Sequence, residues 1–267
     1  MEHITSRANP LIARVRKLAN DAAYRRESAA FVCDGIKLLN EALLPCAAGG
    51  DNTVETVLFS DTAYPGGAGL PPMSSAVRLV EVPDGVLSVC SPSKTPQGVL
   101  CVCAIPPQVL PDTLDGRRYL ALDGVQDPGN VGTILRTADA FGADGLFLLP
   151  GCADLYHPRT VRASMGAVFR LPAWTCQLGE LADLLDRSRL SLYGAALRAD
   201  AKDPRETDLF RCALAIGSEG RGLSAEVLDL CAGVLRIPMR ARCESLNAAA
   251  AAAVLLWEAA RHDDDFA

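Results

Sequence analysis

The chain has 267 residues, 49% of them hydrophobic and 22% charged, and its formal net charge is −6 at pH 7. This length accommodates two compact cores, and the composition is that of an ordinary globular protein. The acidic balance excludes a protein that coats nucleic acid through bulk charge, although it is compatible with a local basic face.

Neither the first residues nor the apolar runs predict export or membrane insertion. The first ten residues lack the basic start and the apolar stretch of a signal peptide. The longest small and apolar run, 248–257, is too short to cross a bilayer. We therefore expect a cytoplasmic protein without a membrane partner.

Ten cysteines are spread along the chain, and no two have the C-x-x-C spacing of common metal sites. The three histidines do not accompany them in a ligand pattern. Several cysteines lie in apolar runs such as 99–104. The sequence therefore predicts reduced cysteines in the core and no metal ion.

The first hundred residues predict a small α/β domain. Asn9-Pro10 has the form of a helix cap followed by proline at the first helical position, and Leu11, Val15 and Leu18 then recur at helical spacing. A second helix is expected over 36–44, and strands are expected over 29–33, 54–59, 77–82 and 99–104. The domain thus covers 1–104, and the Pro-rich stretch 105–112 is interpreted as a linker.

A second α/β domain is expected over 113–267, where strands and helices alternate. Strands are predicted over 119–122, 146–149, 192–196, 213–216 and 234–237. Helices are predicted over 133–141, 180–189 and 246–261. Apolar strands that alternate with helices indicate a mostly parallel sheet covered on both faces.

Three segments of the second domain have residue types that suit a ligand site. The first, 122–132, follows a predicted strand; Asp-Pro-Gly forces a turn in it, Asn130 can cap the next helix, and Arg136 lies inside that helix. Arginine side chains lean toward the helix N-terminus, so Arg136 can reach the loop. The alternative is a tight turn with a surface arginine.

The second segment, 216–222, is a glycine-rich turn after a strand, and its glycines permit close approach of the backbone to a ligand. It is neither a P-loop nor a dinucleotide fingerprint, and Glu219 within it would repel a phosphate. The third segment contains Ile237-Pro238-Met239 and later Glu244-Ser245-Leu246-Asn247, before six alanines. Ser245 or Asn247 as a simple helix cap is its alternative interpretation.

These three segments, in this order, resemble the three motifs of the SpoU/TrmH RNA 2′-O-ribose methyltransferases of the SPOUT superfamily. The matching patterns are D-x-x-x-D-P-x-N-x-G-x-x-x-R, G-S-E-G-x-G-L and I-P-M-x-x-x-x-E-S-L-N. The stretch 158–169 is similar to the connecting region of that family. The stretches 6–10, 32–35 and 95–99 are similar to its substrate-binding domain. The resemblance covers nearly the whole chain.

The resemblance implies a C-terminal SPOUT domain with a deep trefoil knot, preceded by a small α/β RNA-binding domain, and a homodimer. It implies S-adenosylmethionine as the cofactor, bound by Leu197, Gly217, Ile237 and Leu246. It also implies a set of catalytic residues, namely Asn130, Arg136, Glu219, Ser245 and Asn247.

A basic stretch at the front of the chain is the expected contact with RNA. Four residues of it, Arg7, Arg14, Arg16 and Lys17, are predicted to touch phosphates. A solvated charged helix is the plainer interpretation. Ribosomal RNA is the preferred substrate because of the added front domain, and transfer RNA is the alternative.

Two other classes of protein have to be weighed. A non-catalytic RNA-binding or ribosome-assembly factor on the same scaffold would predict altered motif residues, yet all five candidate catalytic residues are present. A nucleotide- or NAD-binding enzyme is disfavoured because its fingerprints are missing.

Overall fold

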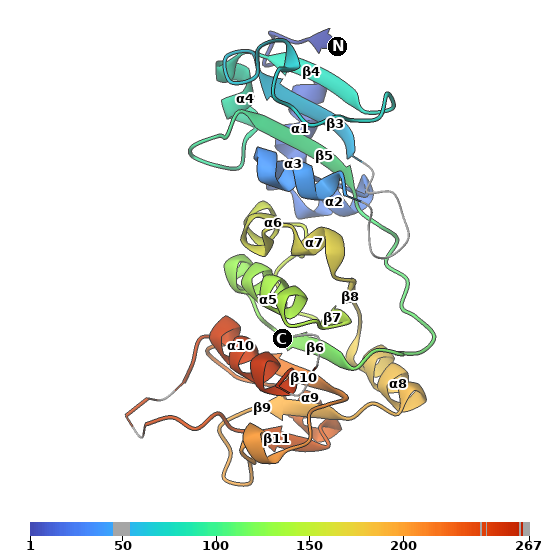
Figure 1. The fold of residues 1–267 in the computed structure, drawn as a ribbon, viewed down its shortest axis with the longest axis vertical. Coiled ribbons are helices and arrows are strands. Elements are labelled where there is room, and N and C mark those ends of the chain that lie inside the picture. The colour runs from blue at the N-terminus through green and yellow to red at the C-terminus, as the bar shows by residue number, and fades with distance from the viewer. Residues whose placement is uncertain (45–53, 241, 244, 262, 264–267) are drawn as a thin grey trace. The chain divides into compact units, whose positions relative to one another are not determined.

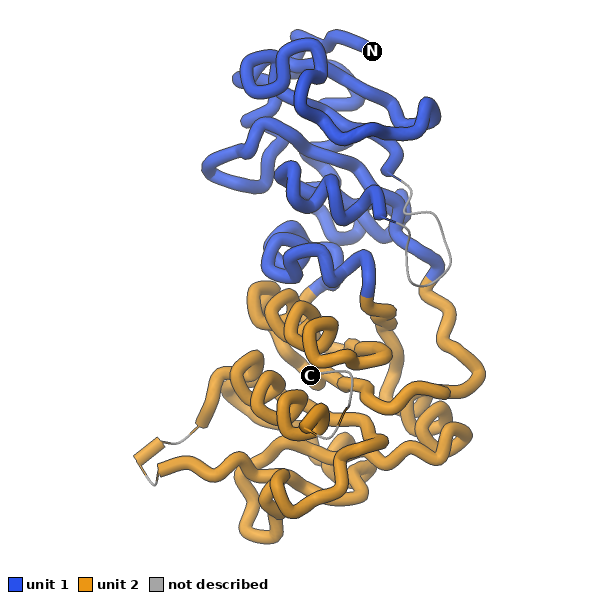
Figure 2. Tube along the Cα trace, in the orientation of Figure 1, with its two compact units in different colours: residues 1–107, 154–170 blue, residues 108–153, 171–267 orange. Residues whose placement is uncertain are grey.

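The computed structural model describes residues 1–44, 54–240, 242–243, 245–261 and 263. Contacts divide the chain into two compact units, unit 1 with residues 1–107 and 154–170 and unit 2 with residues 108–153 and 171–267 (Figure 2). The chain leaves unit 1 within the stretch predicted as a linker. Contacts group residues 154–170, which the expected C-terminal domain includes, with unit 1, and the domain bounds remain a prediction. Among the described residues no helix is both long and apolar enough to span a bilayer.

Unit 1 is built on a five-stranded sheet with the order β1-β4-β3-β5-β2 (Figure 1). Its strands are β1 (Glu2–His3), β2 (Ala30–Asp34), β3 (Val54–Ser60), β4 (Arg78–Val82) and β5 (Val99–Ala104). β1, β4 and β3 are parallel, whereas β5 is antiparallel to both of its neighbours, β3 and β2. The carboxyl ends of β1, β2, β3 and β4 therefore lie at the same end of the sheet, where β5 begins.

Helices cover both faces of this sheet. The helices of unit 1 are α1 (Pro10–Asn20), α2 (Ala22–Glu27), α3 (Ile36–Ala42), α4 (Asp84–Cys90), α6 (Pro158–Ser164) and α7 (Ala167–Arg170), with a short 3-10 helix η1 (Pro65–Gly67). The predicted cap of α1 is confirmed, because Asn9 Oδ1 accepts a hydrogen bond from the Leu11 N–H at 2.9 Å. Leu11, Val15 and Leu18 are buried in a core shared with α4 and the sheet.

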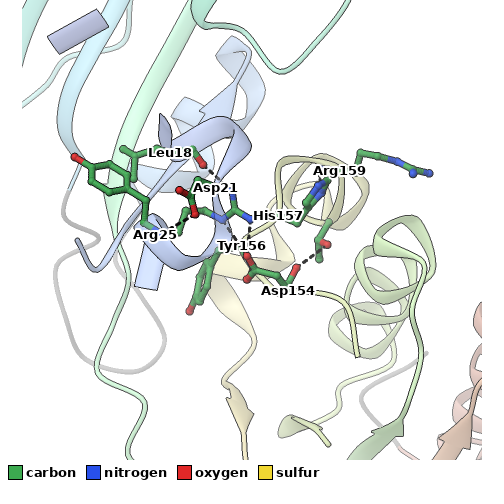
Figure 3. Close-up of polar contacts among 9 residues, drawn as sticks. Leu18, Asp21, Arg25, Asp154, Tyr156, His157 and Arg159 are labelled. Atoms are coloured by element: carbon green, nitrogen blue, oxygen red, sulfur yellow. Dashed lines mark hydrogen bonds and ion pairs between the residues drawn. The ribbon is translucent and has the colours of Figure 1, made fainter. Parts of the chain in front are cut away.

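A buried arginine fixes residues 154–170 in unit 1 (Figure 3). Arg25 is 2% exposed, and its Nε and Nη2 atoms donate to Asp154 Oδ2 at 2.9 and 2.7 Å. The rings of Tyr156 and Phe169 pack on Phe31, with centroids 4.8 and 5.9 Å apart. A buried charge requires a partner, and Asp154 supplies it across 129 residues of sequence. Hydrophobic periodicity carries no signal for such a pair.

His157 begins α6, because its Nδ1 atom accepts a hydrogen bond from the Arg159 N–H at 3.1 Å. Burial and the nearby Arg25 charge lower the pKa of His157 below its usual 6.5. The unfolded chain therefore binds a proton at His157 more readily than the folded chain does. The contribution of neutral His157 to the stability of the folded chain is present above pH about 6.5 and decreases as the pH falls below that value. We expect the free energy of unfolding, measured with urea, to decrease between neutral and mildly acidic pH.

The matched variant is His157→Asn, which keeps a capping side chain that cannot gain a proton. It should flatten this part of the pH profile. Identical profiles for His157→Asn and the unsubstituted chain would refute the assignment.

Unit 2 is a six-stranded sheet with the order β11-β9-β10-β6-β7-β8, and every pairing in it is parallel. Its strands are β6 (Arg118–Asp123), β7 (Gly145–Leu148), β8 (Ala173–Thr175), β9 (Leu192–Ala195), β10 (Cys212–Gly217) and β11 (Gly233–Leu235). The helices are α5 (Pro128–Ala140), α8 (Leu178–Ser188), α9 (Ala225–Leu230) and α10 (Ala248–Ala259), with a 3-10 helix η2 (Pro204–Glu206).

The parallel sheet of unit 2 is covered on both sides, as predicted. Leu181 and Leu184 of α8 and Val227 of α9 share one core cluster with Tyr119, Ala213 and other sheet residues. α5 and α10 pack against each other, and α10 also contacts β10 (Figure 1). The predicted fold class, a mostly parallel α/β unit preceded by a small α/β unit, is confirmed.

Candidate functional site

A pocket of about 430 Å³ lies in unit 2, where parallel strands end. Three of its walls are the loops that follow β9, β10 and β11, within 195–197, 216–223 and 235–239. Ser245, Leu246, the start of α10 and Leu228 of α9 form the rest of the lining. Parallel sheets place their ligands beyond the carboxyl ends of the strands, and this volume lies in the range of small-molecule sites.

All four predicted cofactor residues line this pocket: Leu197, Gly217, Ile237 and Leu246. Leu197 is 54% exposed and Leu246 is 37% exposed, so both present apolar surface at the pocket. The pocket therefore combines an apolar rim with backbone groups from three loops.

Gly217 allows two backbone segments to approach each other at the floor of the pocket. The Ser218 N–H donates to the Gly222 carbonyl at 3.2 Å, and the Gly222 N–H donates back to the Ser218 carbonyl at 2.8 Å. A Cβ atom on Gly217 would lie 2.2 Å from the Gly222 carbonyl carbon, which no rotation of a side chain can relieve. Gly217 thus brings two backbone segments together, and the predicted approach of this turn to a ligand remains a prediction.

Three polar side chains meet at this site from three different loops. The Nδ2 atom of Asn130 donates to Glu219 Oε1, and the Nδ2 atom of Asn247 donates to Asn130 Oδ1 at 3.1 Å. Asn247 Oδ1 in turn accepts from the Ala249 N–H at 2.9 Å, so it caps α10. Because a carboxylate only accepts, these partners fix the orientation of both amides.

The cap of α5 differs from the expectation. Asp127, not Asn130, is the N-cap, and its Oδ1 accepts from the Asn130 N–H at 3.0 Å. The helix consequently begins at Pro128 rather than near Thr133. This arrangement leaves the Asn130 side chain available to Glu219 and Asn247.

Comparison with known proteins decides the family. A model described as the SpoU rRNA methylase family matches residues 117–257, and one described as the MRM3-like substrate binding domain matches residues 9–101. The first covers more than half of the chain. The chain belongs to the SpoU rRNA methylase family. The predicted family is therefore confirmed.

Relatives of this SpoU family member have named activities. It is 31% identical to the 23S rRNA (guanosine(2553)-2′-O)-methyltransferase RlmP of Bacillus subtilis, over 96% of this chain and 98% of the relative. It is 34% identical to the 23S rRNA (uridine(2479)-2′-O)-methyltransferase of Streptomyces viridochromogenes, over 69% of this chain and 67% of that protein.

Solved structures agree with this assignment. The AdoMet-bound rRNA methyltransferase from Sinorhizobium meliloti superimposes with a TM-score of 0.80 at 30% identity, over 98% of both chains. The SpoU methyltransferase AviRb from Streptomyces viridochromogenes, in complex with AdoMet, gives a TM-score of 0.80 at 28% identity, over 95% of this chain and 97% of that one. The cofactor of the SpoU family member is thus S-adenosylmethionine.

Among the described residues, the remaining predicted catalytic residues, Ser245 and Arg136, are not hydrogen-bonded to the polar trio. Ser245 lines the pocket, whereas Arg136 lies on the exposed side of α5. Across the described residues, the Arg136 side chain forms no hydrogen bond or ion pair. Glu244 of the third motif lies outside the described residues. The roles of these residues remain predictions.

Several residues at the pocket were not among the predicted site residues. Arg221, Arg236 and Met239 contribute to its lining. Asp123 Oδ2 accepts from the Ser224 N–H at 2.6 Å and so connects the end of β6 to the start of α9. Their positions directly after strands, or beside the recognised motifs, were the signal that could have found them.

The predicted RNA-binding residues lie on and before α1, and they differ in their surroundings. Arg7 and Arg16 are exposed. Arg14 forms an ion pair with Glu55 at 2.8 Å, and the Lys17 ammonium lies 4.1 Å from the centre of the Tyr24 ring. The first two are therefore the better placed to meet a phosphate.

Three buried cysteines gather in unit 1, although their spacing did not suggest it. The sulfur atoms of Cys33, Cys101 and Cys103 all lie within 4.8 Å of one another on two paired strands. Burial raises the pKa of the Cys33 thiol. The absence of a metal ion remains a prediction for this cluster.

Proposed function

We propose that this protein transfers a methyl group from S-adenosylmethionine to a ribose 2′-hydroxyl of ribosomal RNA, most specifically of the large subunit. The observation that carries the proposal is the convergence of all four predicted cofactor residues on one pocket beside the Asn130–Glu219–Asn247 trio. Two relatives named as 23S rRNA 2′-O-methyltransferases support the choice of RNA.

The pocket fits S-adenosylmethionine in size and in chemistry. Leu197, Ile237 and Leu246 offer apolar surface for an adenine ring, and the Gly217 turn leaves backbone groups accessible. When bound, the cofactor supplies a methyl group on a sulfonium that is already a good leaving group. The protein then has to position the hydroxyl in line with that methyl group.

Arg136 is proposed to act on the hydroxyl without removing its proton. An arginine guanidinium stays charged under ordinary conditions, so it cannot serve as a base. It can orient the ribose hydroxyl and the adjacent phosphate and stabilise the negative charge that develops on the oxygen. The proton then passes to phosphate or water.

Asn130, Glu219, Ser245 and Asn247 are proposed to hold the methionine end of the cofactor and to orient Arg136. The trio supports this role because its hydrogen bonds join the start of α5, the loop after β10 and the start of α10. A displacement of one of these three segments would therefore be transmitted to the other two.

The test is transfer of tritiated methyl groups to ribosomal RNA and, separately, to transfer RNA, both from a strain that lacks the gene. Label in ribosomal RNA that survives alkaline hydrolysis as a dinucleotide establishes 2′-O-ribose methylation. Label in transfer RNA alone would identify transfer RNA, and not ribosomal RNA, as the substrate. Absence of calorimetric cofactor binding would instead favour a non-catalytic RNA-binding factor.

Neutralising Arg7 and Arg16 together should weaken RNA binding and flatten its dependence on salt. Each lost phosphate contact lowers the slope of log K against log salt by about 0.7 on single strands, so the pair should lower it by about 1.4. Filter binding over a series of KCl concentrations measures this slope. An unchanged slope would remove both residues from the RNA interface.

We also infer that the protein is a cytoplasmic homodimer. Val254 and Trp257 on α10 are 41% and 62% exposed, and Trp257 packs edge-on against Phe141 at 5.9 Å. The alanines of α10 leave this helix thin enough for a second copy to approach closely. The exposed apolar side chains support that arrangement.

A further inference from the structure

Three cysteine thiols lie together in the core of unit 1, and the proposed function uses none of them. Cys33 on β2 is the direct partner of Cys101 on β5, because the two strands pair antiparallel in this register. Cys103 lies two residues further along β5, so its side chain is on the same face of the sheet as that of Cys101. Cys33, Cys101 and Cys103 are together called the thiol cluster.

The distances within the thiol cluster suit one small central atom. All three cysteines are free thiols. The Sγ atoms of Cys101 and Cys103 are 3.9 Å apart, and the three Sγ atoms all lie within 4.8 Å of one another. Three sulfurs bound to a single soft atom, with bonds of about 2.3 Å, lie at most about 4 Å apart. Small rotations of the side chains would therefore bring all three sulfurs onto one atom.

The donor atoms of the thiol cluster are sulfur alone. Among the described residues, no histidine or carboxylate joins the three thiols in a group of possible ligands. Sulfur selects soft central atoms, whereas magnesium and calcium require oxygen. Zinc usually takes four ligands, and this cluster supplies three. The donor set therefore favours a soft centre whose coordination is complete with three sulfurs.

Burial limits the charge that a complex at the thiol cluster can carry. Cys33 and Cys101 are 1% exposed and Cys103 is 3% exposed, so the cluster is shielded from bulk water. Three thiolates around a monovalent ion leave two negative charges, and three around a divalent ion leave one. A buried charge without a partner is costly, and the carboxylate of Asp34 acts on the Cys101 sulfur as a further negative charge. A trivalent centre leaves the complex neutral.

The residues paired with the thiol cluster across the sheet are apolar. Phe31 of β2 is the direct partner of Cys103, and Val57 of β3 is the partner of Cys101 on its other side. Both side chains are buried in the sheet. A neutral complex places no charge among them, so these surroundings tolerate it better than a charged one.

We propose that the thiol cluster is a binding site for a trivalent, thiophilic metalloid, with arsenous acid as the ligand. Each of the three thiols forms one sulfur–arsenic bond, and its proton leaves with one hydroxyl of the acid as water. Three arsenic–oxygen bonds break, three sulfur–arsenic bonds form and three water molecules are released. Arsenic stays trivalent throughout, so neither an oxidant nor a reductant is required. The expected absence of a metal ion at this cluster is unaffected.

The folded arrangement should bind the ligand more tightly than three separate thiols. Once the first bond has formed, the second and third are intramolecular, so the effective concentration of the remaining thiols is high. Cys101 and Cys103 are close in sequence, but Cys33 is brought to them by the pairing of β2 with β5. β2 is the last strand of its sheet, so local opening at this edge gives the ligand a route to the buried sulfurs.

The test measures how much arsenic the full chain binds. Protein reduced with a phosphine, which adds no competing thiol, is dialysed against a series of sodium arsenite concentrations, and bound arsenic is counted by mass spectrometry. Cys33→Ala, Cys101→Ala and Cys103→Ala are compared with Cys90→Ala. The control removes a cysteine of unit 1 that is also 1% exposed but lies in α4, with its Sγ 3.9 Å from the Ile12 carbonyl oxygen. Urea unfolding checks that each variant folds.

The unsubstituted chain and Cys90→Ala should bind one arsenic atom per chain with the same affinity. Each cluster variant should bind it roughly a hundredfold more weakly, because one of the three intramolecular bonds is lost. Equal affinity in all four variants would overturn the proposal, and so would the absence of binding by the unsubstituted chain. None of these measurements uses RNA or S-adenosylmethionine, so their outcome is independent of the proposed function.

Two further measurements on the unsubstituted chain do not depend on the folding of any variant. X-ray absorption at the arsenic edge should show three sulfur neighbours and no oxygen, and two sulfurs with one oxygen would contradict the site. An equal concentration of Cd²⁺ should leave the arsenic bound, because the cadmium complex with three thiolates carries a buried negative charge. Displacement of arsenic by cadmium would show that a divalent ion is preferred and would overturn the assignment.

Discussion

Replacing Arg136 with alanine should reduce methyl transfer by about 10²–10³-fold or more, because it removes a positioned charge that acts on the reacting oxygen. Cofactor affinity should change little, since Arg136 is exposed on α5 and lies outside the pocket lining. Stability should also be retained, because the side chain forms no ion pair with any described residue. Single-turnover methyl transfer and calorimetry with S-adenosylmethionine measure the two effects separately.

Two variants give this prediction its controls. Arg136→Lys keeps the positive charge but loses the planar, two-pronged donor, so it should recover only part of the activity. Arg187→Ala removes an exposed arginine from α8 and should have almost no effect on transfer. Full activity in Arg136→Ala would show that the hydroxyl is activated by another group.

Replacing Gly217 with alanine should abolish measurable binding of S-adenosylmethionine. The new methyl group would lie 2.2 Å from the backbone of Gly222, so the two segments would have to separate and the pocket floor would move. Backbone cannot rotate away as a side chain can, and the hydrogen-bonded pair between Ser218 and Gly222 would be lost. Calorimetry should therefore show no binding at cofactor concentrations that saturate the unsubstituted chain.

Gly220 provides the matched control in the same turn. A Cβ atom there meets nothing within 4 Å, and its backbone does not adopt a positive φ, so Gly220→Ala should bind the cofactor normally. Urea unfolding of both variants tests whether Gly217→Ala loses its pocket or its fold. Equal affinity in the two variants would contradict the close approach at Gly217.

Strands of both units could be predicted because each is an apolar run bounded by turn residues. The run 99–104 is β5 with the predicted bounds, and 146–149 corresponds to β7 with a shift of one residue. Short elements were missed, among them β8 and α9, because three or six residues carry little periodic signal. α6 was missed for a different reason, since its start depends on His157 and on the distant Arg25.

The cofactor residues could be named only through the resemblance to a family. Leu197 follows β9 and Gly217 lies at the end of β10, and nothing in their spacing shows that these strands are neighbours. Asn130 was predicted as the cap of α5, and nothing in the sequence indicated that Asp127 takes this place. In the structure, the Asn130 side chain instead donates a hydrogen bond to Glu219 and accepts one from Asn247.

The arrangement of residues 154–170 has a consequence for how the protein is made. Phe31 is 1% exposed, yet two of the rings that cover it belong to Tyr156 and Phe169. A nascent chain that has been synthesised only to residue 107 therefore has an uncovered aromatic face and an unpaired Arg25. Contacts of such long range form late, so unit 1 completes its core only after the first strands of unit 2 have left the ribosome.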